Sequence, residues 1–224
     1  MKLVIFDCDG TLVDSQAMIV ASLTRAFELE GLTPPTRPAM LSIVGLSLIN
    51  AMRKLAPDES EAKQEALSEA YKQSFWKYRE EEQHSELLFP GAVEVLDWLH
   101  AHPQVALGIA TGKSRRGVDK LLAKHALEGR FITIQTSDSA PSKPDPGMIL
   151  NAMAEANIGP NDTVMIGDAT YDLDMANAAG VASIGVSWGF MERPLLEACK
   201  PHSILNHFNE LEGVLQQIFP ELAE

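Results

Sequence analysis

The sequence predicts an α/β protein in which helices cover both faces of a parallel sheet and an all-α domain is inserted after the first strand. Short apolar runs that are typical of buried strands alternate with helical patterns along most of the chain. The segment 15–86, in contrast, shows helical spacing and no strand. Four polar strings stand at the ends of apolar runs or just before helices, close to where ligands bind in parallel sheets.

The first element is a buried strand over residues 3–6, which ends at Asp7 and Asp9. The helical stretch that follows is far longer than a usual connection between strands. We therefore expect residues 15–86 to form a helical cap domain over the site. The core domain then consists of residues 1–14 and 87–224.

Capping residues mark several of the predicted helix ends. Asp14 and Ser15 are typical helix-start residues, Pro146 suits a first helical position, and Gly180 suits a helix end. Further strands are expected over 105–110, 131–134, 163–166 and 182–186, and further helices around 93–99, over 114–124 and 146–156, through 175–179, and near 192–199 and 207–218.

Composition excludes several classes of function. A net charge of −13 argues against a nucleic-acid binder, which would show a basic face. The apolar stretch at the start is too short for a signal peptide, and no stretch approaches the ~20 apolar residues of a membrane span. We expect a cytoplasmic monomer or homodimer with two reduced cysteines, Cys8 and Cys199. Alternation along the strand turns the Cys8 side chain away from the neighbouring carboxylates.

Four aspartates are expected in one crevice. Asp7 and Asp9 follow the first strand, and Asp168 and Asp172 follow the strand predicted over 163–166. Their carboxylates would repel each other strongly unless a divalent cation neutralised them. Mg²⁺ is the expected ion because it prefers oxygen ligands, and no Cys/His cluster suggests zinc.

The same crevice offers groups that hold an anion. Lys143 supplies a positive charge, and Thr111 supplies a hydroxyl next to a predicted helix start. Together with a metal ion, these groups could hold a phosphoryl group. Asp7, the aspartate closest to the rigid strand, is then the expected nucleophile, and Asp9 the expected acid and base. The expected partner is a small-molecule phosphate ester.

These strings resemble the motifs of the haloacid dehalogenase superfamily of phosphatases, in the order of that family and over nearly the whole chain. Phe89-Pro-Gly91 also matches the return of that family from cap to core. The four matching strings are Asp7-Cys-Asp-Gly-Thr-Leu-Val-Asp-Ser15, Thr111-Gly-Lys113, Lys143-Pro144 and Gly167-Asp-Ala-Thr-Tyr-Asp172.

The resemblance implies a Rossmann-like core with sheet order 5-4-1-2-3 and a helical cap. It implies Mg²⁺ held by the Asp7 carboxylate, the Asp9 backbone carbonyl and Asp168, with Asp172 helping directly or through the outer sphere. It also implies phosphate binding by Thr111, Gly112 and Lys143. Within the family the chain is most similar to phosphoglycolate-phosphatase-like enzymes of small metabolites.

Two other functions are alternatives. Phosphoglucomutase-type members of the same family transfer a phosphoryl group, but they usually carry an arginine after a Gly-Leu-Ser string in the cap. Here Gly45-Leu-Ser47 is followed by Leu48. A receiver-like switch also forms an aspartyl-phosphate, but it holds the phosphate, whereas Asp9 should discharge it here.

Overall fold

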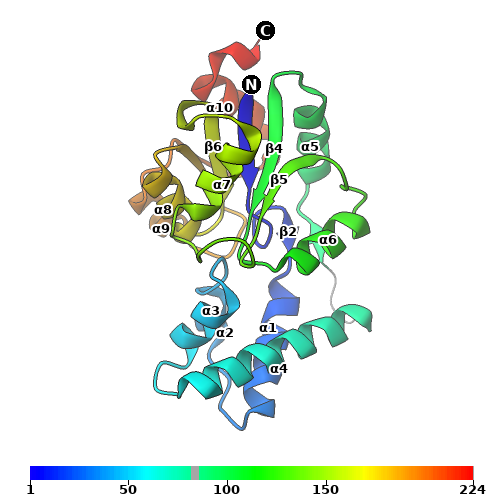
Figure 1. Cartoon of the computed structure of the whole chain (residues 1–224), viewed down its shortest axis with the longest axis vertical. Coiled ribbons are helices and arrows are strands. Elements are labelled where there is room, and N and C mark those ends of the chain that lie inside the picture. The colour runs from blue at the N-terminus through cyan, green and yellow to red at the C-terminus, as the bar shows by residue number, and fades with distance from the viewer. Residues whose placement is uncertain (82–85, 224) are drawn as a thin grey trace.

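The computed structural model describes residues 1–81 and 86–223, and in these residues one parallel sheet forms the centre of the fold (Figure 1). Its order is β5-β4-β1-β6-β7-β8. Along the chain, β1, β4, β5, β6 and β7 are the first to fifth strands of this sheet. Read from β7 to β5, their order in the sheet is therefore 5-4-1-2-3, which confirms the prediction. The strands are β1 (Lys2–Phe6), β4 (Val105–Ala110), β5 (Phe131–Gln135), β6 (Thr163–Gly167), β7 (Ala182–Val186) and β8 (Ser203–Leu205).

Strand β8 is missing from the sequence prediction. It pairs in parallel with β7 at the edge of the sheet, between Ile184↔Ser203 and Val186↔Leu205. Three residues are too few to show an alternating pattern, so its pairing with β7 decides its conformation.

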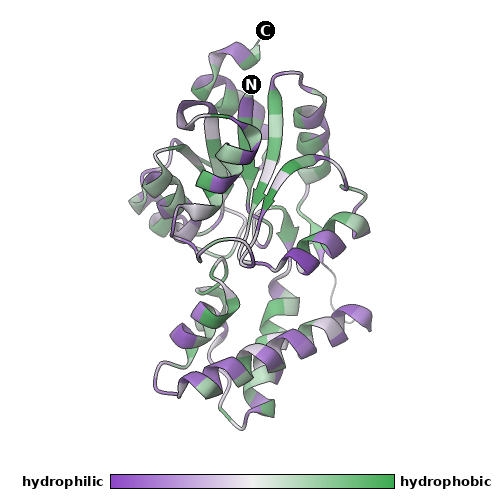
Figure 2. Cartoon of the chain, viewed as in Figure 1, coloured by the Kyte–Doolittle hydropathy of each residue, from purple (hydrophilic) through white to green (hydrophobic). Residues whose placement is uncertain are grey.

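Alternation along β1 divides the core into two layers. Val4 and Phe6 pack with α5, α6 and α10 on one face, whereas Leu3 and Ile5 pack with α7 and α8 on the other. The strands are accordingly among the most hydrophobic parts of the chain (Figure 2). The helices are α5 (Ala92–Ala101), α6 (Arg115–Lys124), α7 (Gly147–Ala156), α8 (Thr170–Ala179), α9 (Arg193–Ala198) and α10 (Leu211–Ile218), with 3₁₀ turns at Pro160–Asp162, Phe208–Glu210 and Pro220–Ala223.

The helix ends agree with the capping residues in the sequence. Gly180 ends α8 with a φ of 69°, a left-handed conformation that glycine adopts without steric cost. Pro146 stands at the N-cap of α7, so that the helix begins one residue later than predicted. Ser114 caps α6 by accepting a hydrogen bond from the Gly117 backbone N–H.

Four of the described helices, which lie between β1 and α5 along the chain, have an apolar cluster of their own, which includes Met18, Leu23, Met52 and Leu67. They lie beyond the end of the sheet that is opposite the two chain termini (Figure 1). The predicted cap also includes residues 82–85, which lie outside the described residues. The helices are α1 (Gln16–Leu29), α2 (Arg37–Leu41), α3 (Leu48–Leu55) and α4 (Glu61–Glu80).

A short antiparallel ribbon joins the helical segment to the sheet domain. It consists of β2 (Val13–Asp14) and β3 (Leu87–Leu88), which pair at Val13↔Leu88 and Asp14↔Leu87. The chain therefore leaves and re-enters the core at neighbouring points. Across the described ranges, no helix is both long enough and apolar enough to span a membrane.

This ribbon makes the proposed domain boundary testable. Because Asp14 and Leu87 are paired, a short Gly/Ser linker can replace residues 15–86 without moving the core strands. We expect this variant to unfold cooperatively, since both apolar layers of the sheet are retained. Thermal and urea unfolding followed by circular dichroism measure this. Loss of a cooperative transition would show that residues 15–86 are part of the core.

Candidate active site

Three buried carboxylates meet at the carboxyl ends of two neighbouring strands. Asp7 follows β1 and donates its backbone N–H to Ile166 O at 3.0 Å, while Asp168 and Asp172 follow β6. One oxygen from each of the three aspartates lies within 4.8 Å of the others. The pairing of β1 with β6 therefore brings together residues that are more than a hundred positions apart.

Lys143 lies between two of these carboxylates. Its Nζ is 3.0 Å from Asp7 Oδ1 and 2.5 Å from Asp172 Oδ1, and all three side chains are buried. Burial alone would lower the pKa of Lys143, but Asp172 and Asp7 outweigh burial and raise it. Lys143 therefore carries a fixed positive charge in this crevice.

Asp172 uses both of its oxygens within the protein. Oδ1 pairs with Lys143, and Oδ2 accepts a hydrogen bond from the Ala169 backbone N–H at 3.1 Å, at the start of α8. Gly167 makes this arrangement fit, because a Cβ there would lie 2.3 Å from Asp172 atoms. Asp172 thus orients Lys143 and, from the first turn of α8, caps the N-terminus of its own helix.

Asp168 is held in place by groups that the sequence did not reveal. The Thr11 hydroxyl donates to Oδ1 at 3.1 Å, and the Phe190 backbone N–H donates to Oδ2 at 2.8 Å. A Cβ at Gly10 or Gly189 would lie within about 2.2 Å of Asp168 atoms, so glycine is required at both positions. The Gly-Thr pair after Asp9 was the only sequence signal for these contacts.

Burial, together with neighbouring acids, raises the pKa of two aspartates. The pKa of Asp7 is raised to about 7, because burial and the smaller contributions of Asp172 and Asp9 outweigh the lowering effect of Lys143. Burial also raises the pKa of Asp168 well above its ordinary value, with contributions from Asp172 and Asp7. Both carboxyls are therefore poised to exchange a proton for a cation.

The carboxylate cluster fits a divalent metal ion. Three acids surround one lysine, so fully ionised carboxylates leave a local charge of about −2. Among the described residues, the buried Asp7 Oδ1 has no hydrogen-bond partner, and its contact with Lys143 is an ion pair only. An oxygen-rich site with excess negative charge is one that a hard cation such as Mg²⁺ prefers.

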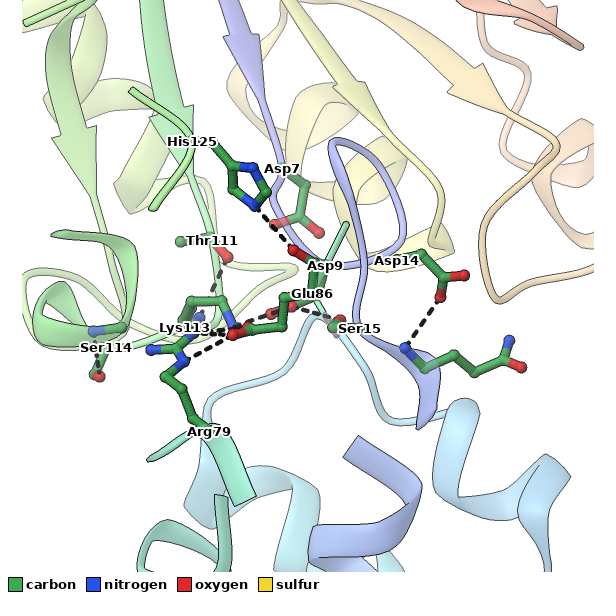
Figure 3. A network of polar contacts seen from close by, with 12 residues as sticks. Asp7, Asp9, Asp14, Ser15, Arg79, Glu86, Thr111, Lys113, Ser114 and His125 are labelled. Atoms are coloured by element: carbon green, nitrogen blue, oxygen red, sulfur yellow. Dashed lines mark hydrogen bonds and ion pairs between the residues drawn. The ribbon is translucent and has the colours of Figure 1, made fainter. Parts of the chain in front are cut away.

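The Asp9 carboxylate points toward other partners. Oδ1 lies 3.0 Å from Lys113 Nζ and accepts a hydrogen bond from the Ser15 hydroxyl at 2.6 Å (Figure 3). The sequence favoured a helix cap for Ser15, but its hydroxyl donates to Asp9 instead. Asp14 does serve as a capping residue, accepting from the Gln16 backbone N–H at 3.2 Å.

Lys113 connects Asp9 to the helical segment. Its Nζ lies 3.6 Å from Glu86 Oε1, and Glu86 accepts two hydrogen bonds of 2.7 Å from Arg79 at the end of α4 (Figure 3). Asp9 and Glu86 raise the pKa of Lys113 against the lowering effect of burial. Glu86 and Arg79 belong to no motif in the sequence, so only the structure places them next to Lys113.

A cavity of about 800 Å³ opens between the helical segment and the core. Asp7, Asp9, Thr111 and Gly112 line it from the core side. A Cβ at Gly112 would lie 2.5 Å from Leu46 O, so the loop before α3 approaches this turn closely. Three further residues of the site are buried and do not line the cavity: Lys143, Asp168 and Asp172. They lie next to Asp7, which does line it.

Cys8 has no part in this site. It is fully buried in the same apolar layer as Val4 and Phe6, on the opposite side of the strand from Asp7, as the alternation predicted. Burial raises the pKa of its thiol, with further contributions from Asp7 and Asp9. A buried, protonated thiol is a poor nucleophile.

Known proteins resemble this chain over most of its length. A family model described as haloacid dehalogenase-like hydrolase matches residues 4–186. The chain is 36% identical to the probable phosphatase IndB of Dickeya dadantii, over 94% of this chain and 92% of that protein. It is 32% identical to a phosphoglycolate phosphatase of Agrobacterium fabrum, over 95% and 91%. A solved hydrolase from Pseudomonas syringae is 26% identical, with a TM-score of 0.86 over 97% and 99%.

The ion pairs of Lys143 predict a large effect on stability. In a Lys143→Met variant, Asp7 and Asp172 lose their buried cation, and we expect the metal-free protein to lose about 3–5 kcal/mol of unfolding free energy. Urea unfolding in excess chelator measures it. The control is Arg193→Met, which breaks the exposed ion pair with Glu197 and should cost less than about 1 kcal/mol. Equal effects of the two substitutions would contradict the central place of Lys143.

Proposed function

Because this chain belongs to the haloacid dehalogenase-like hydrolase family, we propose that it is a Mg²⁺-dependent phosphatase that cleaves small phosphate monoesters through an aspartyl-phosphate. The main support is the position of Asp7. Its carboxylate ends a rigid strand, lines the cavity beside Asp9, and has a buried oxygen without a hydrogen-bond partner in the described residues. The two relatives described above are both named as phosphatases, which agrees with this class of reaction.

In the first step, an Asp7 oxygen attacks phosphorus while the bond to the ester oxygen breaks. The leaving alkoxide takes a proton from the Asp9 carboxyl and departs as the alcohol. This step needs both carboxyls to face one substrate, and both line the same cavity.

In the second step, water attacks the phosphorus of the aspartyl-phosphate while Asp9 accepts a proton from that water. Inorganic phosphate leaves, and Asp7 is restored as a carboxylate. Lys113 and Ser15 hold Asp9 Oδ1 and so fix the direction in which Asp9 exchanges protons.

The phosphoryl oxygens need positive partners during both steps. We assign Thr111, the Gly112 backbone N–H and Lys143 to this task, as the resemblance implied. Thr111 and Gly112 line the cavity, and Lys143 contacts Asp7 directly. Hydrogen-bond donors that are already in place stabilise developing charge without reorganisation.

The Asp7 carboxylate, the Asp9 backbone carbonyl and Asp168 would hold Mg²⁺. Asp172 already pairs with Lys143 and caps α8, which favours a role for it through the outer sphere. When bound, the ion would neutralise the acidic cluster and draw charge from the phosphoryl group.

The substrate to test first is 2-phosphoglycolate, because an enzyme of that name from Agrobacterium fabrum is 32% identical to this chain. A cytoplasmic location and a monomeric or homodimeric state are part of the same proposal.

We expect Asp7→Asn to lower kcat by about 10⁴-fold or more, because an amide oxygen is a poor nucleophile. The variant should stay folded, since the amide keeps the shape of the side chain. Steady-state release of phosphate measures turnover, and Asp145→Asn in an exposed loop is the control. Turnover in Asp7→Asn comparable to wild type would refute the nucleophile. A wild-type protein that retains one phosphate and releases none would indicate a receiver-like switch.

We expect chelation to abolish activity and added Mg²⁺ to restore it, with an affinity that falls below pH 7. The metal-free protein holds a proton on Asp7 below its pKa of about 7, and Mg²⁺ must displace this proton. The affinity should therefore fall about tenfold per pH unit below pH 7 for each proton displaced. Calorimetric titration between pH 5.5 and 8.5 measures this. An affinity independent of pH would exclude Asp7 as a ligand.

A further inference from the structure

The cavity next to Asp7 is larger than the alcohol part of a small phosphorylated acid needs. Its volume is about 800 Å³, within the range of pockets that enclose whole drug-sized ligands. The phosphoryl site takes up only the end formed by Asp7, Asp9 and Thr111. The remaining volume faces the alcohol part of the ester.

The walls of this remaining volume are mainly apolar. They come from the loop before α3, from the first residues of α3, and from α4. Phe75 and Trp76 present aromatic rings near the core, so that both aliphatic and planar groups can pack there. The wall residues that matter most here are Ile43, Leu46, Leu48, Ile49, Phe75 and Trp76.

The cationic residues among the described lining residues already contact other side chains. Lys113 pairs with Asp9 and Glu86, Lys72 lies 3.7 Å from Glu69, and the Arg116 guanidinium lies 4.1 Å from the centroid of the Trp76 ring. Three acids, Glu65, Glu69 and Asp138, also line the cavity. A carboxylate on the leaving group would therefore lose hydration, meet these acids, and have to compete with the side chains that already contact Lys113, Lys72 and Arg116.

We propose that the preferred substrates are phosphate monoesters of alcohols that carry an apolar body, either an aliphatic chain or an aromatic ring. This proposal rests on the phosphatase function proposed above and specifies its substrate class. It ranks such esters above 2-phosphoglycolate, whose leaving group is short and anionic.

Binding of the apolar body can accelerate the reaction. Each methylene group removed from water favours binding by about fourfold. Binding energy from a part of the substrate that does not react raises kcat/KM when it positions the phosphorus against Asp7. The preference should therefore increase with chain length until the cavity is filled.

The test compares ethyl, n-butyl, n-hexyl and 2-phenylethyl phosphate with 2-phosphoglycolate, all in the presence of Mg²⁺. These leaving groups are all primary alcohols, so differences in kcat/KM report binding in the cavity. We expect kcat/KM to rise along the alkyl series, and n-hexyl and 2-phenylethyl phosphate to exceed 2-phosphoglycolate by about tenfold or more. A flat series, or 2-phosphoglycolate as the best substrate, would overturn the proposal.

A substitution in the wall checks that the cavity sets this order. Ile49 is only half-buried and lies at the start of α3, so that Ile49→Arg should fold. The added cation should raise kcat/KM for 2-phosphoglycolate and lower it for n-hexyl phosphate. Asn50→Arg is the matched control, because Asn50 belongs to the same helix but is not a lining residue. Equal shifts in both variants would count against the proposal.

Hydrolysis of p-nitrophenyl phosphate separates the two proposals. This activated ester requires little help from the cavity, so its cleavage reports the phosphoryl site. If it is cleaved while the alkyl series stays flat, the phosphatase function stands and the substrate class is wrong. If none of the esters is cleaved, both proposals are wrong.

Discussion

The buried ion pairs of Lys143 are the interaction on which the site depends. Asp7, Asp168 and Asp172 lie close together because two adjacent strands end at the same edge of the sheet. Such a concentration of carboxylates is unfavourable away from water unless a cation accompanies it. Lys143 contacts two of the three, yet the pKa of Asp7 is still raised, because burial and the neighbouring acids outweigh the lowering effect of Lys143. The same imbalance gives the site its capacity for a divalent ion.

A second lysine links this charged centre to the helices beyond the sheet. Lys113 contacts Asp9 on one side and Glu86 on the other, and Glu86 is held by Arg79 of α4. The position of α4 is therefore coupled by direct contacts to the residue proposed as acid and base. Since α4 also provides Phe75 and Trp76 to the cavity wall, the element proposed to contact the leaving group is also connected to Asp9.

Chemistry and selectivity come from different parts of the molecule. The groups proposed to act on phosphorus are attached to the ends of sheet strands and the turns after them, where the backbone is fixed by pairing. The groups proposed to select the alcohol lie on helices with an apolar cluster of their own. Similarity to phosphatases over most of the chain therefore supports the reaction class more strongly than it supports any one substrate.

The sequence by itself determined most elements of the core and their order. Alternation in β1 separates Val4 and Phe6 from Leu3 and Ile5, and capping residues such as Gly180 fix helix ends, because both signals are local. The four polar strings could also be assigned to one crevice, since parallel strands end at the same edge.

Only the tertiary structure decided how these side chains are used. The Ser15 hydroxyl donates to Asp9 although its position suits a helix cap, Glu86 joins the site without any motif, and β8 forms through pairing with β7. The charge balance around Asp7 and the lining of the cavity also depend on residues that are distant along the chain. Periodicity reports a residue's immediate neighbours, whereas hydrogen bonds, ion pairs and desolvation depend on which segments the fold brings together.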